Sequence, residues 1–425
     1  MKMVIKKGLS KKIDERYSLH IAENYDKQEF QQILELNVNV HGESVRGYLN
    51  RIYLDHPKRD DIYCFYVKDN EANQIVSGLI LLPLEWSFGG KILSICEMGF
   101  VGTLEEYRGK GFIRMLNEEY ERLMTEKGYV MSVIRGIPYF YRKLGYEFAI
   151  PLDHRIILPL SRIPTDELKN LEVRKANLKD INFVNEKYEN YYKSFFISNK
   201  FDKDSYIFKF FNDDYNDFKT STYIIEENGK SVAYFTFGKS YDNLGYDIKT
   251  SQINHELGVK ILQFIKKIHD SETNNEIDIA IREETKLAEL IIELGGITYN
   301  TYGWQVKIPI LKLYLEKIKP LLESRIRNSN FKDLTQNVKI SNYKEIFELL
   351  FNNGTITEIN IEKGYPELGL CDIQAPGPIL YKLLLRDRAF DELNYIIKDA
   401  MIKHSSKGLI DVLFPKENSF PDSYY

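Results

Sequence analysis

The chain of 425 residues has no long hydrophobic run. Its longest candidate, residues 75–86, is only as long as a strand and contains Ser77, Pro83 and Glu85. A helix that crosses a bilayer needs about 20 consecutive, mainly apolar residues. The sequence therefore predicts no membrane-spanning helix and no membrane partner.

Cysteine is scarce, and Cys64, Cys96 and Cys371 lie far apart. The basic segment at residues 1–12 is not followed by the apolar stretch of a secretory signal. We therefore expect a cytoplasmic protein without a disulfide framework. The seven histidines are scattered, and no His or Cys spacing resembles a zinc site, so we expect no metal.

Neither sign of charge dominates, because 58 basic and 62 acidic side chains give a formal net charge of −4. Proteins that grip nucleic acid non-specifically present a basic field, so we expect no nucleic-acid partner. Hydrophobic residues make up 43% of the chain, which excludes a mainly disordered protein. At about 150 residues per domain, the length predicts nearly three domains.

Helix and strand patterns alternate along the first 150 residues. The spacing of apolar residues defines these patterns, and turn residues separate them. Helices, then antiparallel strands, then a strand–helix–strand unit indicate a mixed α/β layer. The predicted helices are residues 26–38, 44–53 and 112–127, and the predicted strands are 62–67, 74–84, 91–103 and 130–134.

Three prolines, Pro151, Pro159 and Pro164, indicate a domain boundary. The segment beyond them repeats the order of the first, which indicates a structural duplication, and a third region starts near Pro309. We predict an α/β (α+β) fold with domains at residues 1–155, 165–308 and 309–425. Beyond the boundary we expect a hairpin at 222–237, helices at 257–269, 285–294, 311–327, 378–387 and 390–401, and strands at 276–281, 347–350 and 355–361.

The most informative segment is the turn Tyr-Arg-Gly-Lys-Gly-Phe-Ile at residues 107–113, between a predicted strand and a predicted helix. Gly109 and Gly111 let the backbone approach a phosphate closely, and the first N–H groups of the helix can bind an anion. Arg108 and Lys110 add positive charge. The turn predicts a pyrophosphate site, with an ordinary tight turn as the alternative.

This turn is not a Rossmann fingerprint, because the preceding strand closes a hairpin, and it is not a P-loop, because no Lys-Ser or Lys-Thr follows the last glycine. It resembles the GNAT superfamily of N-acetyltransferases, in which Arg/Gln-x-x-Gly-x-Gly/Ala cradles the pyrophosphate of acetyl-CoA. Arg108 and Gly111 match the pattern, whereas Ile113 stands where the superfamily usually has Gly or Ala. The resemblance implies cofactor contacts from Arg108, Gly109, Lys110, Gly111, Phe112 and Ile113, and from the backbone of Phe100, Val101, Gly102 and Thr103.

Residues 140–146, Phe-Tyr-Arg-Lys-Leu-Gly-Tyr, resemble the Phe-Tyr-x-x-x-Gly-Phe segment of the same superfamily. By that resemblance Tyr141 is the candidate general acid, which protonates the departing coenzyme A thiolate. The alternative is a tyrosine that packs a short helix onto the sheet.

Glu97 is the first candidate for the general base. It precedes Arg108 by eleven residues, an offset similar to that of the catalytic Glu in the histone-acetylating branch. Burial in a strand would raise the pKa of its carboxyl toward neutrality. A strand Glu that points into solvent stays open as the alternative.

Over its whole length the chain resembles the enhanced-intracellular-survival (Eis) acetyltransferases, which combine a GNAT domain, a motif-poor GNAT-like domain and a sterol-carrier-like domain. Residues 136–141, 146–152, 321–325 and 409–416 carry this likeness. In Eis enzymes the C-terminal carboxylate acts as a base, which makes Tyr425 the second candidate.

Together these likenesses imply an acetyl-CoA-dependent N-acetyltransferase that acts through a ternary complex. The acceptor is expected to be a small-molecule amine such as an aminoglycoside-like compound or a polyamine, or a lysine side chain. Another acyl-CoA, a hydroxyl acceptor, or a noncatalytic protein that binds coenzyme A or lipid stay open as alternatives. Whether the chain forms a homo-oligomer is also open.

Overall fold

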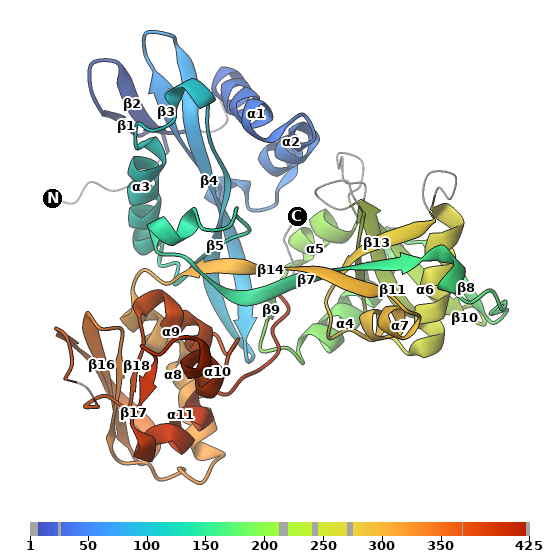
Figure 1. Cartoon of the computed structure of the whole chain (residues 1–425). Coiled ribbons are helices and arrows are strands. Elements are labelled where there is room, and N and C mark those ends of the chain that lie inside the picture. Colours follow the sequence, from blue (N-terminus) through green and yellow to red (C-terminus); the bar gives the residue numbers. More distant parts are fainter. Residues whose placement is uncertain are drawn as a thin grey trace.

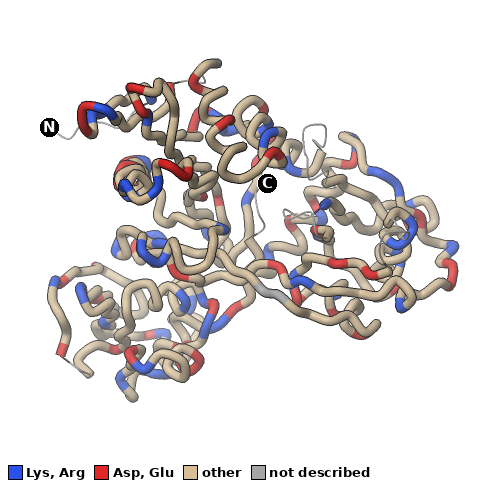
Figure 2. The backbone as a smooth tube through the Cα atoms, turned by 45° about the horizontal axis from the view of Figure 1, so that its top comes forward, with Lys and Arg blue, Asp and Glu red and all other residues tan. Residues whose placement is uncertain are grey.

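The computed structural model describes residues 7–23, 27–211, 220–239, 245–269, 275–367 and 369–421. Figure 1 shows three parts that meet at a central crossing of two strands. Helices and strands are both abundant, and the strands form two sheets, which confirms the predicted mixed α/β class. Basic residues (Lys and Arg) and acidic residues (Asp and Glu) are interspersed over all three parts (Figure 2).

The first unit is a sheet with α3 on one side and α1 and α2 on the other (Figure 1). The predicted strand at 91–103 and helix at 112–127 are confirmed to the residue. Gly128 ends the helix in a left-handed conformation, and its N–H bonds to carbonyls of the last turn. The elements are β1 (Ser10–Lys12), β2 (Tyr17–Ile21), α1 (Lys27–His41), α2 (Val45–Asp55), β3 (Tyr63–Asp69), β4 (Gln74–Phe88), β5 (Lys91–Thr103), α3 (Phe112–Lys127) and β6 (Ser132–Ile134).

The second unit repeats a helix–hairpin–helix order, as predicted. Its hairpin, β10 and β11, turns at Asn228 and Gly229, both with positive φ. The elements are β7 (Glu147–Pro159), β8 (Leu171–Lys175), α4 (Ile181–Tyr192), β9 (Ile197–Asn199), α5 (Lys203–Phe210), β10 (Ser221–Glu227), β11 (Lys230–Lys239), β12 (Tyr246–Thr250), α6 (His255–Ile268), β13 (Glu276–Ile281), α7 (Lys286–Glu293) and β14 (Ile297–Lys307).

Strands β7 and β14 join the two units into one sheet, in which fourteen of the described strands take part. β14 pairs with β6 of the first unit, while β7 pairs with both β14 and β13. Position 155, where we placed the end of the first domain, lies inside β7. The sequence does not predict this strand, because Pro151 and Pro159 indicate a domain boundary. Pro151 fits because the ladder to β14 shifts register beside it, where a missing N–H costs little.

The third part contains a five-stranded sheet in the order β17-β16-β15-β18-β19. The predicted helix at 311–327 is confirmed, whereas the helix predicted at 390–401 ends at Ile396 and Met401 begins a short strand. The elements are α8 (Leu311–Arg327), β15 (Asn337–Ser341), β16 (Glu345–Asn352), β17 (Thr355–Lys363), β18 (Ile373–Gln374), α9 (Gly377–Leu384), α10 (Phe390–Ile396), β19 (Met401–Ile402) and α11 (Lys407–Leu413).

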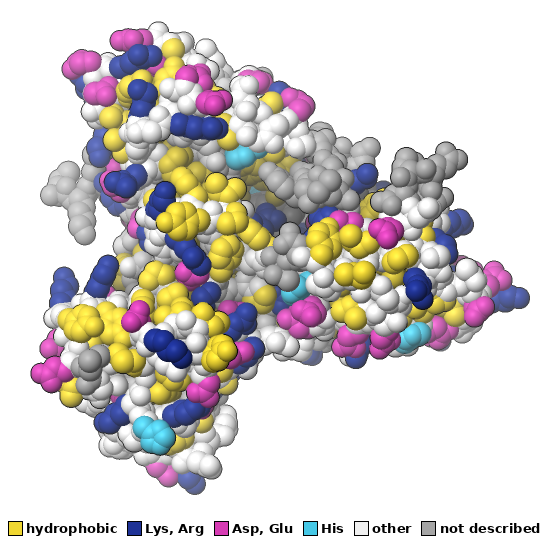
Figure 3. Space-filling model, viewed as in Figure 1, with side chains coloured by type: hydrophobic (Ala, Val, Ile, Leu, Met, Phe, Trp, Pro, Cys, Tyr) yellow, Lys and Arg dark blue, Asp and Glu magenta, His cyan; other side chains and the backbone are white. Residues whose placement is uncertain are grey.

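One hydrophobic core runs through the junction of all three parts. Trp86 of β4 and Trp304 of β14 are fully buried there, with their rings edge to face at 5.7 Å. On the face shown in Figure 3, hydrophobic side chains also gather at the waist between the first and third parts. The three parts therefore pack as one body.

The end of the described chain leaves the third part and lies against the second unit. The N–H of Phe420 bonds at 2.7 Å to the carbonyl of Ile197, the first residue of β9. The indole N–H of Trp304 then donates to the carbonyl of Pro421 at 3.2 Å. The last described residue thus lies at the junction of the parts.

Candidate functional site

Strand β5 contains a bulge at the residues predicted to face the cofactor. Its register against β4 shifts between the pairs Gly78–Gly102 and Ile80–Gly99. Phe100 lies inside this shift with φ of 50°, a conformation that few non-glycine residues adopt. A bulge leaves backbone groups outside the ladder, so Phe100 and Val101 can offer them to a ligand, whereas Gly102 and Thr103 pair with β4.

Strands β5 and β6 run side by side for only two residue pairs, Cys96–Ser132 and Glu97–Val133. β5 then continues to Thr103, whereas β6 ends at Ile134 and pairs with β14 on its other side. The carboxyl ends of these parallel strands therefore diverge directly after Glu97. In open α/β sheets, ligands bind at such divergent carboxyl ends.

The turn before α3 has the geometry of an anion site. Gly109 and Gly111 have φ of 81° and 79°, and a Cβ on either would meet nothing within 4 Å. Within the described ranges, no acceptor is bonded to the backbone N–H groups from Gly109 to Ile113. These groups, together with the helix dipole, favour an anionic ligand.

Arg108 connects this turn to the bulged strand. Its Nε donates to the carbonyl of Thr103 at 3.3 Å, and its side chain is exposed. The ammonium of Lys110 lies 5.6 Å from the ring centroid of Tyr17. Phe112 is buried and anchors the helix, while Ile113 is half-buried. The predicted cofactor residues therefore lie together around one turn and one bulge.

The corresponding helix of the second unit, α6, begins differently. Asn254 caps it, and its side chain accepts a hydrogen bond from the N–H of Leu257 at 2.9 Å. A capped first turn has fewer N–H groups to offer a phosphate. This agrees with the lack of the Arg/Gln-x-x-Gly pattern at residues 255–260.

Tyr141 begins a short 3₁₀ helix, Tyr141–Leu144, after the loop that follows β6. Its ring packs against the backbone of Gly136 and against the ring of Tyr146. Burial raises the pKa of the Tyr141 phenol, so the phenol stays protonated at neutral pH. It is thus available as a proton donor.

Glu97 is buried and paired with Arg135. Nη2 of Arg135 lies 3.3 Å from Oε1 of Glu97, and the two side chains are 32% and 5% exposed. Oε2 of Glu97 is buried without a hydrogen-bond partner. Burial raises the pKa of the Glu97 carboxyl, and the neighbouring Arg135 opposes this shift. One oxygen of this carboxylate is therefore hydrogen-bonded, and the other is buried without a partner.

Two consecutive residues of the loop after β6 contact the two candidate catalytic side chains. Arg135 contacts Glu97, and Gly136 supports Tyr141. The ring of Tyr48, on α2, lies 5.6 Å from that of Phe100 in the bulge. Tyr425, the second candidate base, lies outside the described residues.

Four residues at this site, Arg135, Gly136, Tyr48 and Gln305, are not predicted as site residues by the sequence. Gln305 of β14 donates to the carbonyl of Gly136. Arg135 and Gly136 directly follow a predicted strand that precedes the Phe-Tyr segment, and this position in the sequence could have identified them. Tyr48 and Gln305 are distant in sequence and belong to no local pattern.

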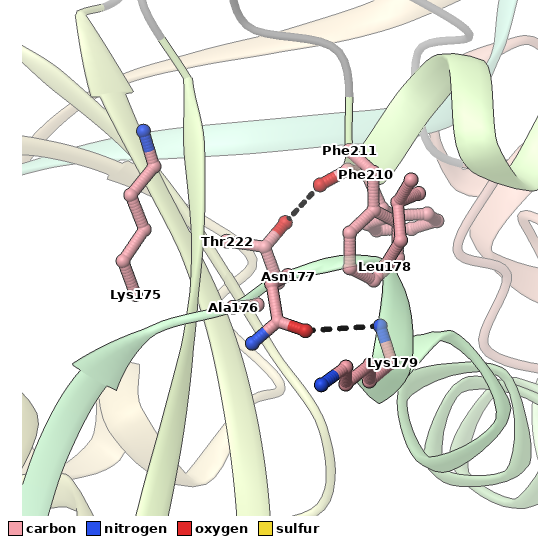
Figure 4. Close-up of a pocket in the computed structure, with 8 residues that line it drawn as sticks. All are labelled: Lys175, Ala176, Asn177, Leu178, Lys179, Phe210, Phe211 and Thr222. Carbon is pink, nitrogen blue, oxygen red and sulfur yellow. Dashed lines mark hydrogen bonds between the residues drawn. The ribbon is translucent and has the colours of Figure 1, made fainter.

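The predicted site residues line neither of two cavities in the described structure. One of about 450 Å³ is in the second unit, where Lys179 N–H bonds to Asn177 and the Thr222 hydroxyl to the carbonyl of Phe210 (Figure 4). Another of about 500 Å³ lies at the start of α2, lined by Glu43, Ser44, Arg46, Gly47 and Asn50. Among the described residues, no group of three or more His, Cys, Asp or Glu is placed to hold a metal ion. No helix in the described part of the chain is long and apolar enough to cross a membrane.

Comparison with known proteins identifies the first unit. Residues 22–149 match the family model described as the acetyltransferase (GNAT) domain. This confirms the predicted GNAT domain for these residues. Among curated proteins, no sequence matches the chain significantly.

Solved structures share the whole fold at low identity. A probable N-acyltransferase of unknown function from Enterococcus faecalis is 13% identical, with a TM-score of 0.68 over 96% of this chain and 100% of that one. A GCN5-related N-acetyltransferase from Anabaena variabilis is 15% identical, with a TM-score of 0.65 over 95% and 99%. One from Kribbella flavida is 12% identical, with a TM-score of 0.65 over 96% and 99%. At these identities the likeness shows the fold of all three parts.

Proposed function

We propose that this chain, whose residues 22–149 match an acetyltransferase (GNAT) domain, transfers an acetyl group from acetyl-CoA to an amine. The observation that carries the proposal is the row of backbone N–H groups from Gly109 to Ile113, which have no acceptor in the described structure and lie at the start of α3. They can hold the pyrophosphate, and Arg108 adds a charge-assisted contact. The pantetheine arm would then follow the bulge at residues 100–103.

The chemistry is one direct transfer. The amine nitrogen attacks the thioester carbonyl carbon and forms a C–N bond. The C–S bond then breaks, and its electron pair leaves on sulfur. Tyr141 gives its phenolic proton to the thiolate, and the nitrogen loses one proton to a base. The released proton balances the one that Tyr141 supplied, so the products are an N-acetylated amine and coenzyme A.

Glu97 is the first candidate for that base. Its Oε2 has no partner, and burial raises its pKa toward the value that a general base needs. The C-terminal carboxylate of Tyr425 is the second candidate. Pro421, the last described residue, bonds to Trp304, whose ring lies 5.3 Å from the guanidinium of Arg135. Arg135 in turn pairs with Glu97.

We also propose that the second unit and the third part follow the Eis-like plan, with a second GNAT-like unit and a sterol-carrier-like part. The repeated element order and the capped start of α6 support a second unit without a pyrophosphate site.

The test combines binding and turnover. Calorimetry should show that acetyl-CoA binds to the full chain, and a thiol-release assay with a panel of amines should show turnover. Turnover only with another acyl-CoA, or only with alcohols, would correct the donor or the acceptor. Binding of acetyl-CoA without turnover would favour a noncatalytic coenzyme A-binding protein, and no binding would reject the proposal.

A further inference from the structure

A buried carboxylate holds the start of the turn that precedes α3. Asp69, at the end of β3, is fully buried. Its Oδ2 accepts hydrogen bonds from Nε and Nη2 of Arg16 at 2.9 and 2.7 Å, and from the hydroxyl of Tyr107 at 3.1 Å. Tyr107 directly precedes Arg108. The carboxylate is therefore bonded to the first residue of the turn at residues 107–113.

The two oxygens of Asp69 have separate partners. Oδ1 accepts from the backbone N–H groups of Glu71 and Ala72, at 3.1 and 3.2 Å, in the turn between β3 and β4. Oδ2 is left for Arg16 and Tyr107. The hydrogen bonds from Arg16 lower the pKa of the Asp69 carboxyl to about 2, so this acceptor is charged at neutral pH. A charged acceptor bonds a hydroxyl more strongly than a neutral one does.

The cross-strand neighbour of Asp69 contacts the same turn. Tyr17 of β2 is paired directly with Asp69, so their side chains lie on one face of the sheet. The ring centroid of Tyr17 lies 6.4 Å from that of Tyr107 and 5.0 Å from that of Phe112, both edge to face. The ammonium of Lys110 lies 5.6 Å from the same centroid. One cross-strand pair therefore contacts the turn along its length.

Such support matters because the turn contains two glycines, Gly109 and Gly111, both with positive φ. Glycine loses more backbone freedom than any other residue when it is ordered. A turn that is already fixed before the ligand arrives binds it at a smaller cost in entropy. The contacts from Asp69 and Tyr17 reach side chains of the turn. They therefore leave its backbone N–H groups to the ligand.

We propose that Asp69, with Tyr17 beside it, is a positioning residue for cofactor binding. It holds the turn at residues 107–113 in the conformation that accepts the pyrophosphate, and it does not touch the cofactor itself. This inference rests on the proposed binding of acetyl-CoA and adds a residue to it. Charge alone predicts the opposite effect, because a carboxylate near an anion site repels the anion and its removal should tighten binding. The sign of the change therefore distinguishes the two.

The test measures acetyl-CoA binding to the full chain by titration calorimetry. In Asp69→Asn the amide oxygen can keep the bonds to Glu71 and Ala72, whereas the amide nitrogen that replaces Oδ2 cannot accept from Arg16 or Tyr107. Binding should weaken roughly 10–100-fold, the range for hydrogen bonds to a charged group. Tyr107→Phe removes one hydroxyl and should weaken binding roughly 3–10-fold. The double variant should bind no more weakly than Asp69→Asn, because both changes remove the same bond.

The second unit offers a matched control. Asp278 of β13 accepts from Arg155 at 2.9 and 2.6 Å and also from the hydroxyl of Tyr299. Asp278→Asn and Tyr299→Phe therefore remove the same groups elsewhere, and both should bind acetyl-CoA like the wild type. In a thiol-release assay, Asp69→Asn should raise the KM for acetyl-CoA more than it lowers kcat, since Tyr141 lies on another segment.

Wild-type or tighter binding in both Asp69→Asn and Tyr107→Phe would overturn the inference while acetyl-CoA binding stands. An equal loss of affinity in the two control variants would also overturn it, because the effect would then be general destabilisation. If Asp69→Asn does not fold, Tyr107→Phe decides alone. Absence of acetyl-CoA binding to the wild type would instead reject the proposed function, and the same titration detects that case before any variant is compared.

Discussion

A Cβ on Gly136 would lie 2.0 Å from Cε2 of Tyr141, so the ring of this tyrosine packs directly on a backbone that has no side chain. The carbonyl of the same glycine accepts a hydrogen bond of 2.7 Å from Gln305 of β14. The second unit therefore positions the loop on which Tyr141 rests.

Gly136→Ala should displace Tyr141 and reduce kcat by roughly a hundredfold, since a displacement of about 1 Å can cost this much. The affinity for acetyl-CoA should not change, because the turn at residues 108–113 is separate. Steady-state kinetics and calorimetry would check both. Gly408→Ala is the control, because its nearest neighbour would be 3.9 Å away. An unchanged kcat in Gly136→Ala would remove the ring packing from the mechanism.

Tyr141→Phe keeps the ring and removes the proton donor. We expect kcat to fall by roughly 10²–10⁴, the range for one general acid–base group. Acetyl-CoA should still bind with wild-type affinity by calorimetry. If kcat stays within a factor of two or so of the wild type, Tyr141 only packs and another group protonates the thiolate.

Arg108→Glu places a negative charge beside the free N–H groups of the turn. A charge-assisted contact becomes a repulsion, so acetyl-CoA binding should weaken by roughly a hundredfold or more. Titration calorimetry measures this directly. Arg162→Glu makes the same charge change at another exposed position and should bind like the wild type. Equal affinity in the two variants would exclude the turn as the pyrophosphate site.

The pH profile separates the two candidate bases. Only the carboxylate form of Glu97 accepts a proton, so activity should be lost as the pH falls through its pKa, which burial raises above the ordinary value of 4.5. Glu97→Gln should remove this acidic limb and lower kcat by roughly 10²–10⁴. Deletion of residues 423–425 should then have little effect. The opposite pattern would assign the base to the C-terminal carboxylate, and normal profiles in both variants would exclude both.

Trp304→Phe tests the attachment of the C-terminal segment. The change keeps an aromatic ring in the core but leaves the carbonyl of Pro421 without its donor, which should cost about 1–3 kcal/mol. The melting temperature should fall accordingly in a thermal unfolding scan. Tyr395→Phe, at a side chain exposed to 82%, should melt like the wild type. An unchanged melting temperature in Trp304→Phe would show that this bond does not stabilise the fold.

The sequence predicted the local elements well because their signals are local. Residues 91–103 and 112–127 are bounded by Gly89-Gly90, a Gly-Lys-Gly turn and Gly128, and each boundary depends on a residue next to it. The turn at residues 108–113 and its candidate cofactor-binding residues could be predicted for the same reason. Their roles stay predictions.

Other features depend on contacts between distant residues. Pro151 and Pro159 indicate a linker, yet β7 runs through both because β13 and β14 pair with it. Likewise, Phe208 and Gln305 reach the first unit only through tertiary packing. No spacing within the sequence reports such contacts.

The pairing of β6 with β14 also sets a condition on synthesis. Gln305 and Gly136 are 169 residues apart, so a growing chain exposes the edge of β6 until β14 has left the ribosome. At about 5–20 residues per second, this delay lasts roughly 10–30 seconds. An open strand edge pairs readily with other chains. The sheet of the first unit therefore has an open edge for this time, and its pairing is completed only when β14 of the second unit has been made.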